Sequence, residues 1–201
     1  MPLKVNPNRM ELLRLKRRLA VAKRGHKLLE DKLEGLIQKF MEEVRNYKLL
    51  REEISEKFFS FLSLGSFIYL RIPSFQWKDL ILINEGETTL REKIIKEMNI
   101  SIPIITVENI YLPKYSLLST PETLDELTLR WEELLEGLIA LANKERELLA
   151  LSEEIERTKR RVNALEYKLI PQIEETVKYI TTKLEELERG NFARLLRLKE
   201  S

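Results

Sequence analysis

The side chains in this sequence that could do chemistry are few in kind. The 201 residues include no Cys and one His, which excludes thiol nucleophiles, Cys-ligated metals and any site built on two imidazoles. The 33 Asp and Glu residues recur at the spacings of ion pairs on helix surfaces. Phosphate-binding loops, dinucleotide fingerprints, zinc-protease motifs and calcium loops do not occur in the sequence. We therefore expect a protein that is not an enzyme and has neither a cofactor nor a metal site.

Positive charge gathers in two segments. Residues 1–29 hold nine Lys and Arg against one acid, Glu11, and residues 157–170 hold five against Glu166. Residues 122–156 hold eleven acids and three bases. The formal net charge is only +2, so any basic function depends on this local clustering. If the chain folds back on itself, the two basic segments would lie side by side as a basic collar.

The single imidazole stands among apolar residues at helical spacing. His26 follows the same steps of three and four residues as its leucine neighbours, so we expect a packed, partly polar core residue. A contact to a partner protein is the alternative. Gly25 beside it weakens a helix relative to Ala, which is consistent with the close approach of another backbone or with simple tolerance.

The elements that must position these side chains are two long helices. The first has apolar residues at heptad spacing from Leu12 through Phe40 to Phe61, over about seven heptads, with Glu43 and Lys57 as charged exceptions. The second has a strict seven-residue column made of Leu127, Leu134, Leu141, Leu148, Ile155, Val162 and Leu169. Its companion column slips, which is typical of a stutter that locally unwinds a supercoil.

Prolines and glycines set the expected boundaries. Asn6 before Pro7 and Thr120 before Pro121 read as helix starts. Pro171 should kink the second helix near Leu169 and Ile170 because it removes a backbone hydrogen bond. The expected divisions are an N-terminal coiled-coil helix, a central head, a C-terminal coiled-coil helix and a tail broken by Gly190 and Asn191, over residues 6–64, 65–119, 120–189 and 190–201.

Two heptad segments in one chain most simply pair with each other. We predict an all-α dominated fold, a long antiparallel two-helix coiled coil with a small central β-hairpin-like head. A parallel dimer of two chains is the competing arrangement. If Phe61 lies opposite Glu122, Lys23 comes level with roughly Arg160.

The middle of the chain is rich in aromatic and β-branched residues. Seven of the fifteen aromatic residues lie between Phe58 and Trp77, and β-branched runs at residues 80–83 and 100–107 favour short strands. Residues 88–98 fit a helix or a strand. We expect the aromatic surface to pack against the end of the coiled coil, or to dock a partner if it is exposed.

Two segments near the ends of the chain carry distinctive strings. Residues 8–32 read NRMELLRLKRRLAVAKRGHKLLEDK, and residues 160–180 read RRVNALEYKLIPQIEETVKYI. These strings resemble the N-terminal and C-terminal signatures of the D subunit of the archaeal-type and vacuolar-type rotary ATPases. The resemblance covers both helices. The head departs from the family, because only Ile100 to Pro103 echoes its Gly-Val-x-x-Pro strand.

The resemblance implies the central stalk, or rotor shaft, of an A-type or V-type ATP synthase. Such a protein does no bond chemistry and transmits torque that couples ATP synthesis or hydrolysis to proton or sodium transport. Its implied partners are the catalytic and non-catalytic subunits of the hexamer and the smaller central-stalk subunits, namely F and the membrane-rotor adaptor. Candidate contacts to the hexamer are Arg14, Lys16, Arg17, Arg18, Lys23, Arg24, His26, Arg160, Arg161, Asn163, Glu166, Tyr167 and Tyr179. Candidate head contacts to the stalk subunits are Phe67, Tyr69, Phe75 and Trp77.

Location and alternative functions follow from the same features. The longest uncharged run, Phe58 to Leu70, is too short to span a bilayer, so we expect no membrane insertion. The resemblance implies a peripheral place on the cytoplasmic side of a membrane complex. A nucleic-acid-binding coiled coil is an alternative that predicts salt-sensitive binding, but the nearby acids argue against it, so we expect no nucleic acid partner. A prefoldin-like chaperone is another alternative, to which the arginines are poorly suited.

Overall fold

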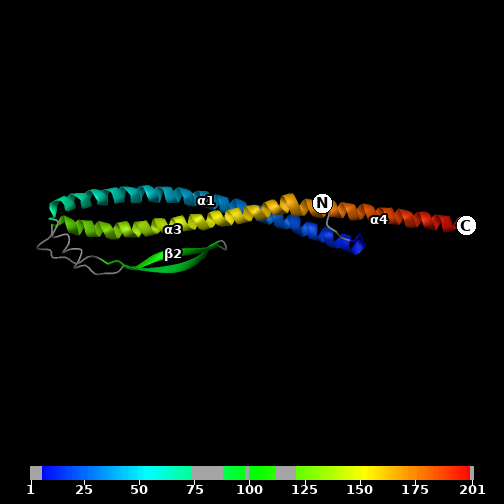
Figure 1. Cartoon of the computed structure of the whole chain (residues 1–201), viewed down its shortest axis with the longest axis horizontal. Helices are drawn as coiled ribbons and strands as arrows, with labels where there is room; N and C mark the ends of the chain where they lie inside the picture. Colours follow the sequence, from blue (N-terminus) through cyan, green and yellow to red (C-terminus); the bar gives the residue numbers. More distant parts are fainter. Residues whose placement is uncertain (1–5, 74–87, 98–99, 112–120, 200–201) are drawn as a thin grey trace. The chain divides into compact units, whose positions relative to one another are not determined.

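Two long helical segments flank a two-stranded hairpin. The computed structural model describes residues 6–73, 88–97, 100–111 and 121–199, with side chains through Leu196. The elements, in chain order, are α1 (Arg9–Arg71), β1 (Thr89–Glu97), β2 (Ile100–Asn109), α3 (Thr123–Ala164), the π-helical turn η1 (Leu165–Leu169) and α4 (Ile170–Lys199) (Figure 1). This order confirms the predicted fold class. No helix in the described ranges combines the length and apolarity needed to cross a membrane.

The chain divides into two compact units. Unit 1 comprises residues 1–37 and 155–201, and unit 2 comprises residues 38–154. Helix α1 contributes its first half to unit 1 and its second half to unit 2. The two units are described in turn.

Helix α1 begins two residues later than the Asn6 cap predicted. The side-chain Oδ1 of Asn8 accepts a hydrogen bond from the N–H of Glu11 at 2.7 Å, and the Asn8 carbonyl accepts from the N–H of Leu12 at 3.1 Å. Asn8 is therefore the N-cap, because it satisfies a backbone donor that the first turn leaves without a partner. The cap expected at Thr120 lies outside the described residues.

Unit 1 has a narrow apolar seam between antiparallel helices. Leu15, Ile173 and Ile180 form its buried core. Partly buried residues packed against this core are Leu12, Leu19, Leu169, Val177 and Leu184. Lys23 contacts Glu174 with Nζ and Oε1 2.6 Å apart, and Arg9 pairs with Glu188. These pairs confirm the antiparallel arrangement and show that Lys23 lies beside Glu174, not level with Arg160 as predicted.

The disturbance expected near Pro171 takes the form of a π-helical turn. In η1 the N–H of Ile170 bonds to the carbonyl of Leu165, one residue further back than in an α-helix. Pro171 has no N–H and its ring would crowd the carbonyl four residues earlier, so the widened turn relieves that strain. Continuing the column of Leu151 and Thr158 by sevens would bury positions 172 and 179, yet the buried residues are Ile173 and Ile180. The extra residue in the π turn has shifted the inward face by one.

Unit 2 pairs the second half of α1 with most of α3. Helix α1 continues through Gly65 to Arg71, seven residues past the expected end, because its apolar spacing persists and Ile68 packs on Leu124 in a buried cluster. The ring centroid of Phe61 is consequently 5.8 Å from that of Trp131. The predicted register, with Phe61 opposite Glu122, is therefore wrong, because the chain reverses later than the boundary at Gly65 implied.

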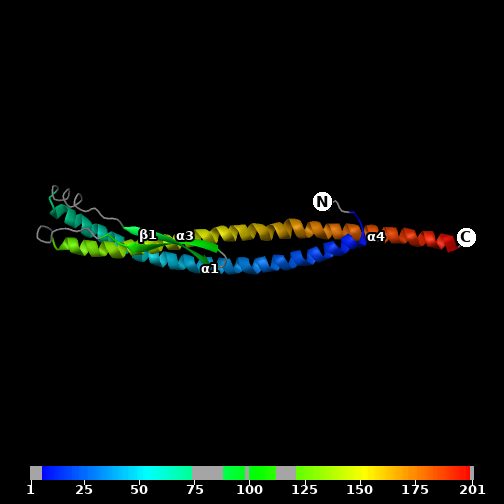
Figure 2. The same cartoon turned by 90° about the horizontal axis from the view of Figure 1, so that it is seen from below.

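The hairpin of unit 2 lies along α3, as both views show (Figures 1 and 2). Strands β1 and β2 are antiparallel, with Glu92 opposite Ile105 and Glu97 opposite Ile100. Ile100 and Ile102 are buried, whereas every residue of β1 is exposed. Residues 89–97 are thus strand, which resolves the helix-or-strand alternative, and only β2 contributes to the core.

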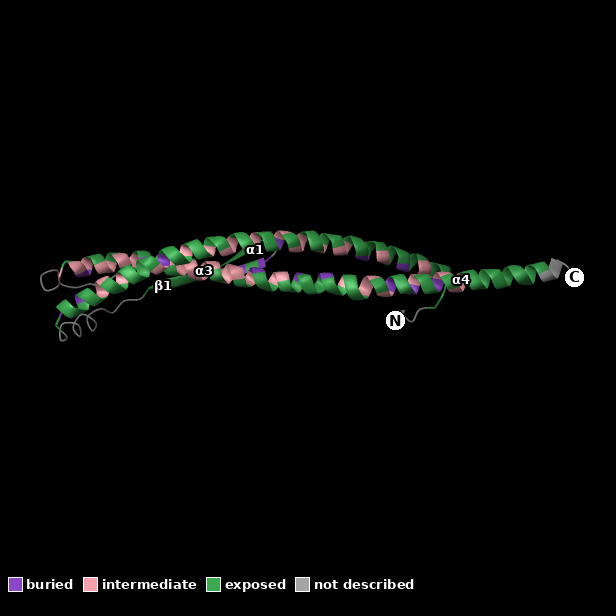
Figure 3. Cartoon of the chain, turned by 90° about the horizontal axis from the view of Figure 1, so that it is seen from above, coloured by how far each residue is buried: buried purple, intermediate pink, exposed green. Residues whose placement is uncertain are grey.

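Helix α4 continues past its partner in unit 1. Glu188 pairs with Arg9 at the start of α1, and α4 runs on to Lys199 without the break expected at Gly190 and Asn191. An added Cβ at Gly190 would meet nothing within 4 Å. The residues after Glu188 with described side chains are all exposed, as the burial colours show (Figure 3).

Candidate functional site

The predicted basic residues of α1 are exposed, and Lys23 among them borders the seam, where it pairs with Glu174. The seam residues Leu15 and Leu19 point inward, whereas the exposed positions between them carry Lys16, Arg17 and Arg18. Arg14, Lys23 and Arg24 are exposed as well, and we call the set Arg14, Lys16, Arg17, Arg18, Lys23 and Arg24 the basic face. An Arg side chain on such a surface can form two parallel hydrogen bonds to one carboxylate of a partner protein.

Sequence reasoning missed an apolar component of this surface. Met10, Leu13, Val21 and Leu28 are exposed on the same helix, with Val21 60% and Leu28 69% accessible. Arg14, Arg17, Val21, Arg24 and Leu28 follow steps of three and four, so they form one stripe opposite the seam. The spacing of these residues could have predicted this second stripe, once the apolar seam that includes Leu15 and Leu19 is assigned to the core. Arginine interleaved with large apolar residues favours a protein-binding surface over a solvated face.

Two of the predicted site residues meet across unit 1. His26 is only 16% exposed, and its Nδ1 lies 3.2 Å from Glu30 Oε2 while its Nε2 lies 3.9 Å from Glu166 Oε2. Among the described residues, Nε2 is buried without a hydrogen-bond partner. His26 is therefore a largely buried polar member of the seam, as expected for a packed, partly polar core residue.

The two basic segments of the predicted collar meet in part, where His26 lies beside Glu166. Residues 9–23 of α1 lie beside residues 174–188 of α4, because Arg9 pairs with Glu188 and Lys23 pairs with Glu174. Arg160 instead pairs with Glu156 on its own helix, and Arg161 is exposed. The two basic segments are offset along unit 1 because the late reversal of the chain shifts the register of the helices.

The remaining predicted contacts lie around the π turn. Asn163 and Glu166 are exposed, and Tyr167 and Tyr179 are 74% and 46% accessible. A shallow depression of about 680 Å³ beside the turn is lined by Tyr167, Lys168, Pro171, Gln172, Glu174, Glu175 and Lys178. Its lining belongs to η1 and α4 alone, so the widened turn creates a local hollow on one face of the helix.

A second surface lies at the end of α1 in unit 2. We call the exposed residues Phe58, Phe59, Leu62, Phe67, Tyr69 and Leu70 the apolar end surface. Leu62, Tyr69 and Leu70 border a hollow of about 430 Å³ that reaches Gly65 and Leu127. The Arg71 guanidinium stacks 4.5 Å from the Phe67 ring centroid. Phe67 and Tyr69 therefore sit on a helix and are exposed, which favours docking over packing, and Phe75 and Trp77 lie outside the described residues.

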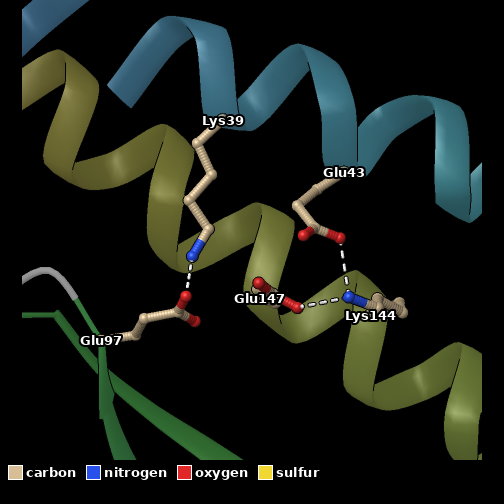
Figure 4. A network of polar contacts seen from close by, with 5 residues as sticks. All are labelled: Lys39, Glu43, Glu97, Lys144 and Glu147. Atoms are coloured by element: carbon tan, nitrogen blue, oxygen red, sulfur yellow. Dashed lines mark hydrogen bonds and ion pairs between the residues drawn. The ribbon is translucent and has the colours of Figure 1, made fainter. Parts of the chain in front are cut away.

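A polar network ties the hairpin and both helices of unit 2 together (Figure 4). Lys144 on α3 donates to Glu43 on α1 at 2.6 Å and to Glu147 at 3.0 Å, and Lys39 on α1 pairs with Glu97 on β1. The hydrogen bond from Lys144 lowers the pKa of Glu43. Desolvation opposes the charge of Lys144, but its bonds to Glu43 and Glu147 prevail and raise the pKa of its ammonium group.

The charged groupings of the described residues are ion pairs. The described residues contain no cluster of three or more His, Asp or Glu that could hold a metal ion. Several carboxylates, such as those of Glu53, Glu126 and Glu186, form ion pairs within one helix surface, where such pairs contribute little to stability. The surfaces that could act are interaction surfaces, one basic and apolar in unit 1 and one apolar in unit 2.

Comparison with known proteins assigns the chain to a family. The family model for the D subunit of ATP synthase matches residues 11–200. The chain is 39% identical to the V-type ATP synthase D subunit of Acetivibrio thermocellus, over 98% of this chain and 91% of that one. It is 41% identical to the A-type ATP synthase D subunit of Thermococcus sibiricus, over 98% and 94%. With a match across nearly its whole length, the chain belongs to the family of ATP synthase D subunits.

Proposed function

We propose that this chain is the central shaft of an A-type or V-type rotary ATP synthase. It turns inside the hexamer of catalytic and non-catalytic subunits, and its other end joins the smaller central-stalk subunits, F and the membrane-rotor adaptor. It does no bond chemistry and passes torque between ATP synthesis or hydrolysis and proton or sodium transport. Within the complex it lies peripherally, on the cytoplasmic side of the membrane. The observation that carries the proposal is the antiparallel pairing of two long helices in a chain of this family.

Torque requires that the paired helices not slide or unwind. In unit 1 the interdigitated seam resists sliding, because moving one helix by a residue would take Leu15, Ile173 and Ile180 out of register. In unit 2 the bonds from Lys144 to Glu43 and from Lys39 to Glu97 add cross-links at the same level. Each unit therefore has the internal stiffness that a shaft needs.

Coupling also requires that different sides of the shaft differ chemically. The outer side of α1 in unit 1 carries the basic face with Val21 and Leu28 between its cations. The outer side of α4 carries the hollow near Pro171, with Glu174 and Glu175 among its lining. As the shaft turns, a given loop of the hexamer meets a positive side and then a mixed one, so the binding energy varies with angle.

The ends of the chain's helices offer apolar contacts. Beyond its pairing with α1, α4 exposes Phe192, Leu195 and Leu196, which would be buried inside the hexamer. The apolar end surface of unit 2 would receive the stalk subunits. Its aromatic side chains supply the large contact area per residue that binding hot spots use.

The test is native mass spectrometry of the chain with the catalytic and non-catalytic subunits of its own source, followed by an ATPase assay. One copy per hexamer with altered turnover is the expected result. A hexamer that excludes the chain, alongside a stable homodimer or salt-sensitive nucleic acid binding, would refute the shaft.

Variants then locate the contact. Replacing both Arg17 and Arg18 by Gln should weaken hexamer binding roughly tenfold or more, with helicity unchanged, because charge-assisted contacts are lost. The same change at Arg160 and Arg161 tests the second basic segment separately. Unchanged assembly and coupled activity in both double variants would remove the arginines from the mechanism while leaving the shaft itself intact.

A further inference from the structure

The hairpin has one closed edge and one open edge within the described ranges. The side chain of Asn143 closes the edge of β2, since the N–H of Ile105 donates to its Oδ1 at 2.8 Å and its Nδ2 donates to the Ile105 carbonyl at 2.7 Å. The amide thereby takes the place of a neighbouring strand. β1 is exposed along all nine residues and pairs with β2 alone among the described strands.

The pairing identifies which backbone groups face the open edge. Ile105 turns its N–H and carbonyl towards Asn143, so its pair with Glu92 is one in which the two residues do not bond each other. The N–H and carbonyl of Glu92 must then point outward. Alternation along the strand gives the same direction at Ile94 and Lys96. Consistently, the Arg91 carbonyl faces β2, where it accepts from Thr106 Oγ1 at 3.2 Å.

The open edge carries unneutralised positive charge. The carboxylates of β1 are already engaged, because Glu92 approaches Arg146 at 3.5 Å and Glu97 pairs with Lys39. Lys93 and Lys96 have no ion-pair partner among the described residues. Ile94 and Ile95, which lie between them, are 66% and 42% exposed. The edge is therefore apolar at its centre and cationic on both sides.

We propose that the open edge of β1 binds one extended acidic segment of another protein subunit, which adds to the hairpin as a third strand. Backbone bonds to Glu92, Ile94 and Lys96 would supply the affinity, and carboxylates beside Lys93 and Lys96 would supply the selectivity. A second copy of this chain fits less well, because it would bring two more unpaired lysines and carboxylates that are already occupied. The inference does not depend on torque transmission.

Hydrogen exchange and zero-length crosslinking test the strand. The native assembly is isolated from source cells, and exchange of its β1 amides is compared with that of the isolated full-length chain. We expect the amides of Glu92, Ile94 and Lys96 to exchange at least tenfold more slowly in the assembly. Carbodiimide coupling should join Lys93 or Lys96 to Asp or Glu of one other subunit.

Three outcomes overturn the inference. The first is that the β1 amides exchange as fast in the assembly as in the isolated chain. The second is that they are already protected in the isolated chain, which would mean that the chain covers its own edge. The lysines could also couple only to a second copy. Loss of the ATPase subunits from the isolated assembly would instead refute the proposed function, so the two failures are distinguishable.

A matched pair of variants separates the edge from the hairpin itself. Ile94→Pro removes an outward N–H that β2 does not use, and a proline is tolerated at such an edge position. It should cut lysine coupling at least tenfold while the Ile105 amide stays protected. Ile94→Val retains the N–H and should couple like the parent chain. Equal coupling by both variants would exclude the backbone pairing.

Discussion

Asn143 is the side chain on which docking of the hairpin depends most directly. Its amide bonds both the N–H and the carbonyl of Ile105, at 2.8 and 2.7 Å. In Asn143→Ala both backbone groups lose their partners, while the burial of Ile100 and Ile102 continues to hold the strand. The variant should thus loosen β2 locally and leave the helices in place.

The magnitude follows from the two bonds. A neutral intramolecular hydrogen bond contributes about 0.5–1.5 kcal/mol, and the site is only partly buried, so we take roughly 1–2 kcal/mol for the pair. Since about 1.4 kcal/mol corresponds to a tenfold change in an equilibrium constant, local opening becomes roughly 5–30 times more frequent. The Ile105 amide should exchange faster by that factor.

Amide hydrogen exchange of the full-length chain, read at Ile105 and in the core of α3 near Leu134, measures this directly. Asn163→Ala is the control, because Asn163 is exposed and its side chain makes none of the contacts described above. Faster exchange at Ile105 with an unchanged α3 is the expected result. If Ile105 exchanged at the parental rate in Asn143→Ala, the amide would not be the group that closes the edge of β2.

Three further predictions concern stability. Thr158→Val should raise the free energy of unfolding by about 1 kcal/mol, because the Thr158 hydroxyl is buried without a hydrogen-bond partner among the described residues. Thr176→Val should raise the free energy of unfolding by less, because the Thr176 hydroxyl donates a hydrogen bond to the Gln172 carbonyl at 2.6 Å. Denaturant titration of both variants compares the two changes in stability. Ile180→Ala, at a fully buried position, should cost about 2–5 kcal/mol in the same titration, and a cost below about 1 kcal/mol would contradict the packing of the unit 1 core. The lowered pKa of Glu43 stabilises the fold above the ordinary carboxyl range, and this contribution is lost as pH falls through the folded-state pKa. Glu43→Gln should therefore flatten the stability profile as the pH falls below the ordinary carboxyl range, and an unaltered profile would show that the bond from Lys144 has no net effect.

Heptad spacing predicted the parts of the fold that depend on one helix at a time. Leu15, Leu36 and Ile54 are buried at seam positions read from the sequence, and the second column likewise buries Leu134 and Val162. Such positions could be predicted because a helix that packs on one side must carry apolar residues every three or four positions.

The register between the helices could not be predicted, because it depends on where the chain reverses. Gly65 resembles a boundary, yet it lies inside α1, where an added Cβ would make only ordinary contact with Leu127 at 3.8 Å. That misplacement moved the partner of Phe61 from Glu122 to Trp131, and the partner of Lys23 moved further still, from Arg160 to Glu174. Glycine within a helix is a statistical signal of a break, and continued packing overrides it.

The attachment of the hairpin to α3 could not be predicted from the sequence, for a different reason. Asn143 lies on α3, 38 residues from Ile105, and nothing in a helical asparagine indicates that it will pair with a strand. The aromatic residues were expected to pack against the end of the coiled coil, beyond a helix ending at residue 64. Phe67 and Tyr69 are instead exposed on α1 itself, which continues to Arg71. Both depend on tertiary contacts.

The π turn at η1 fixes how the two parts of the C-terminal segment can be exchanged or edited. Each helical residue rotates the chain by roughly 100°, and the π turn takes up one residue without turning the side chains that follow it. Deletion of one residue between Leu165 and Leu169 would therefore restore an α-helix and leave Ile173 and Ile180 in the seam. Closing the turn to an α-helix at the full residue count would instead bring Gln172 and Tyr179 into their places. A chimera that joins α3 of this chain to α4 of a relative must therefore match the residue count to the type of turn, whatever its amino acids.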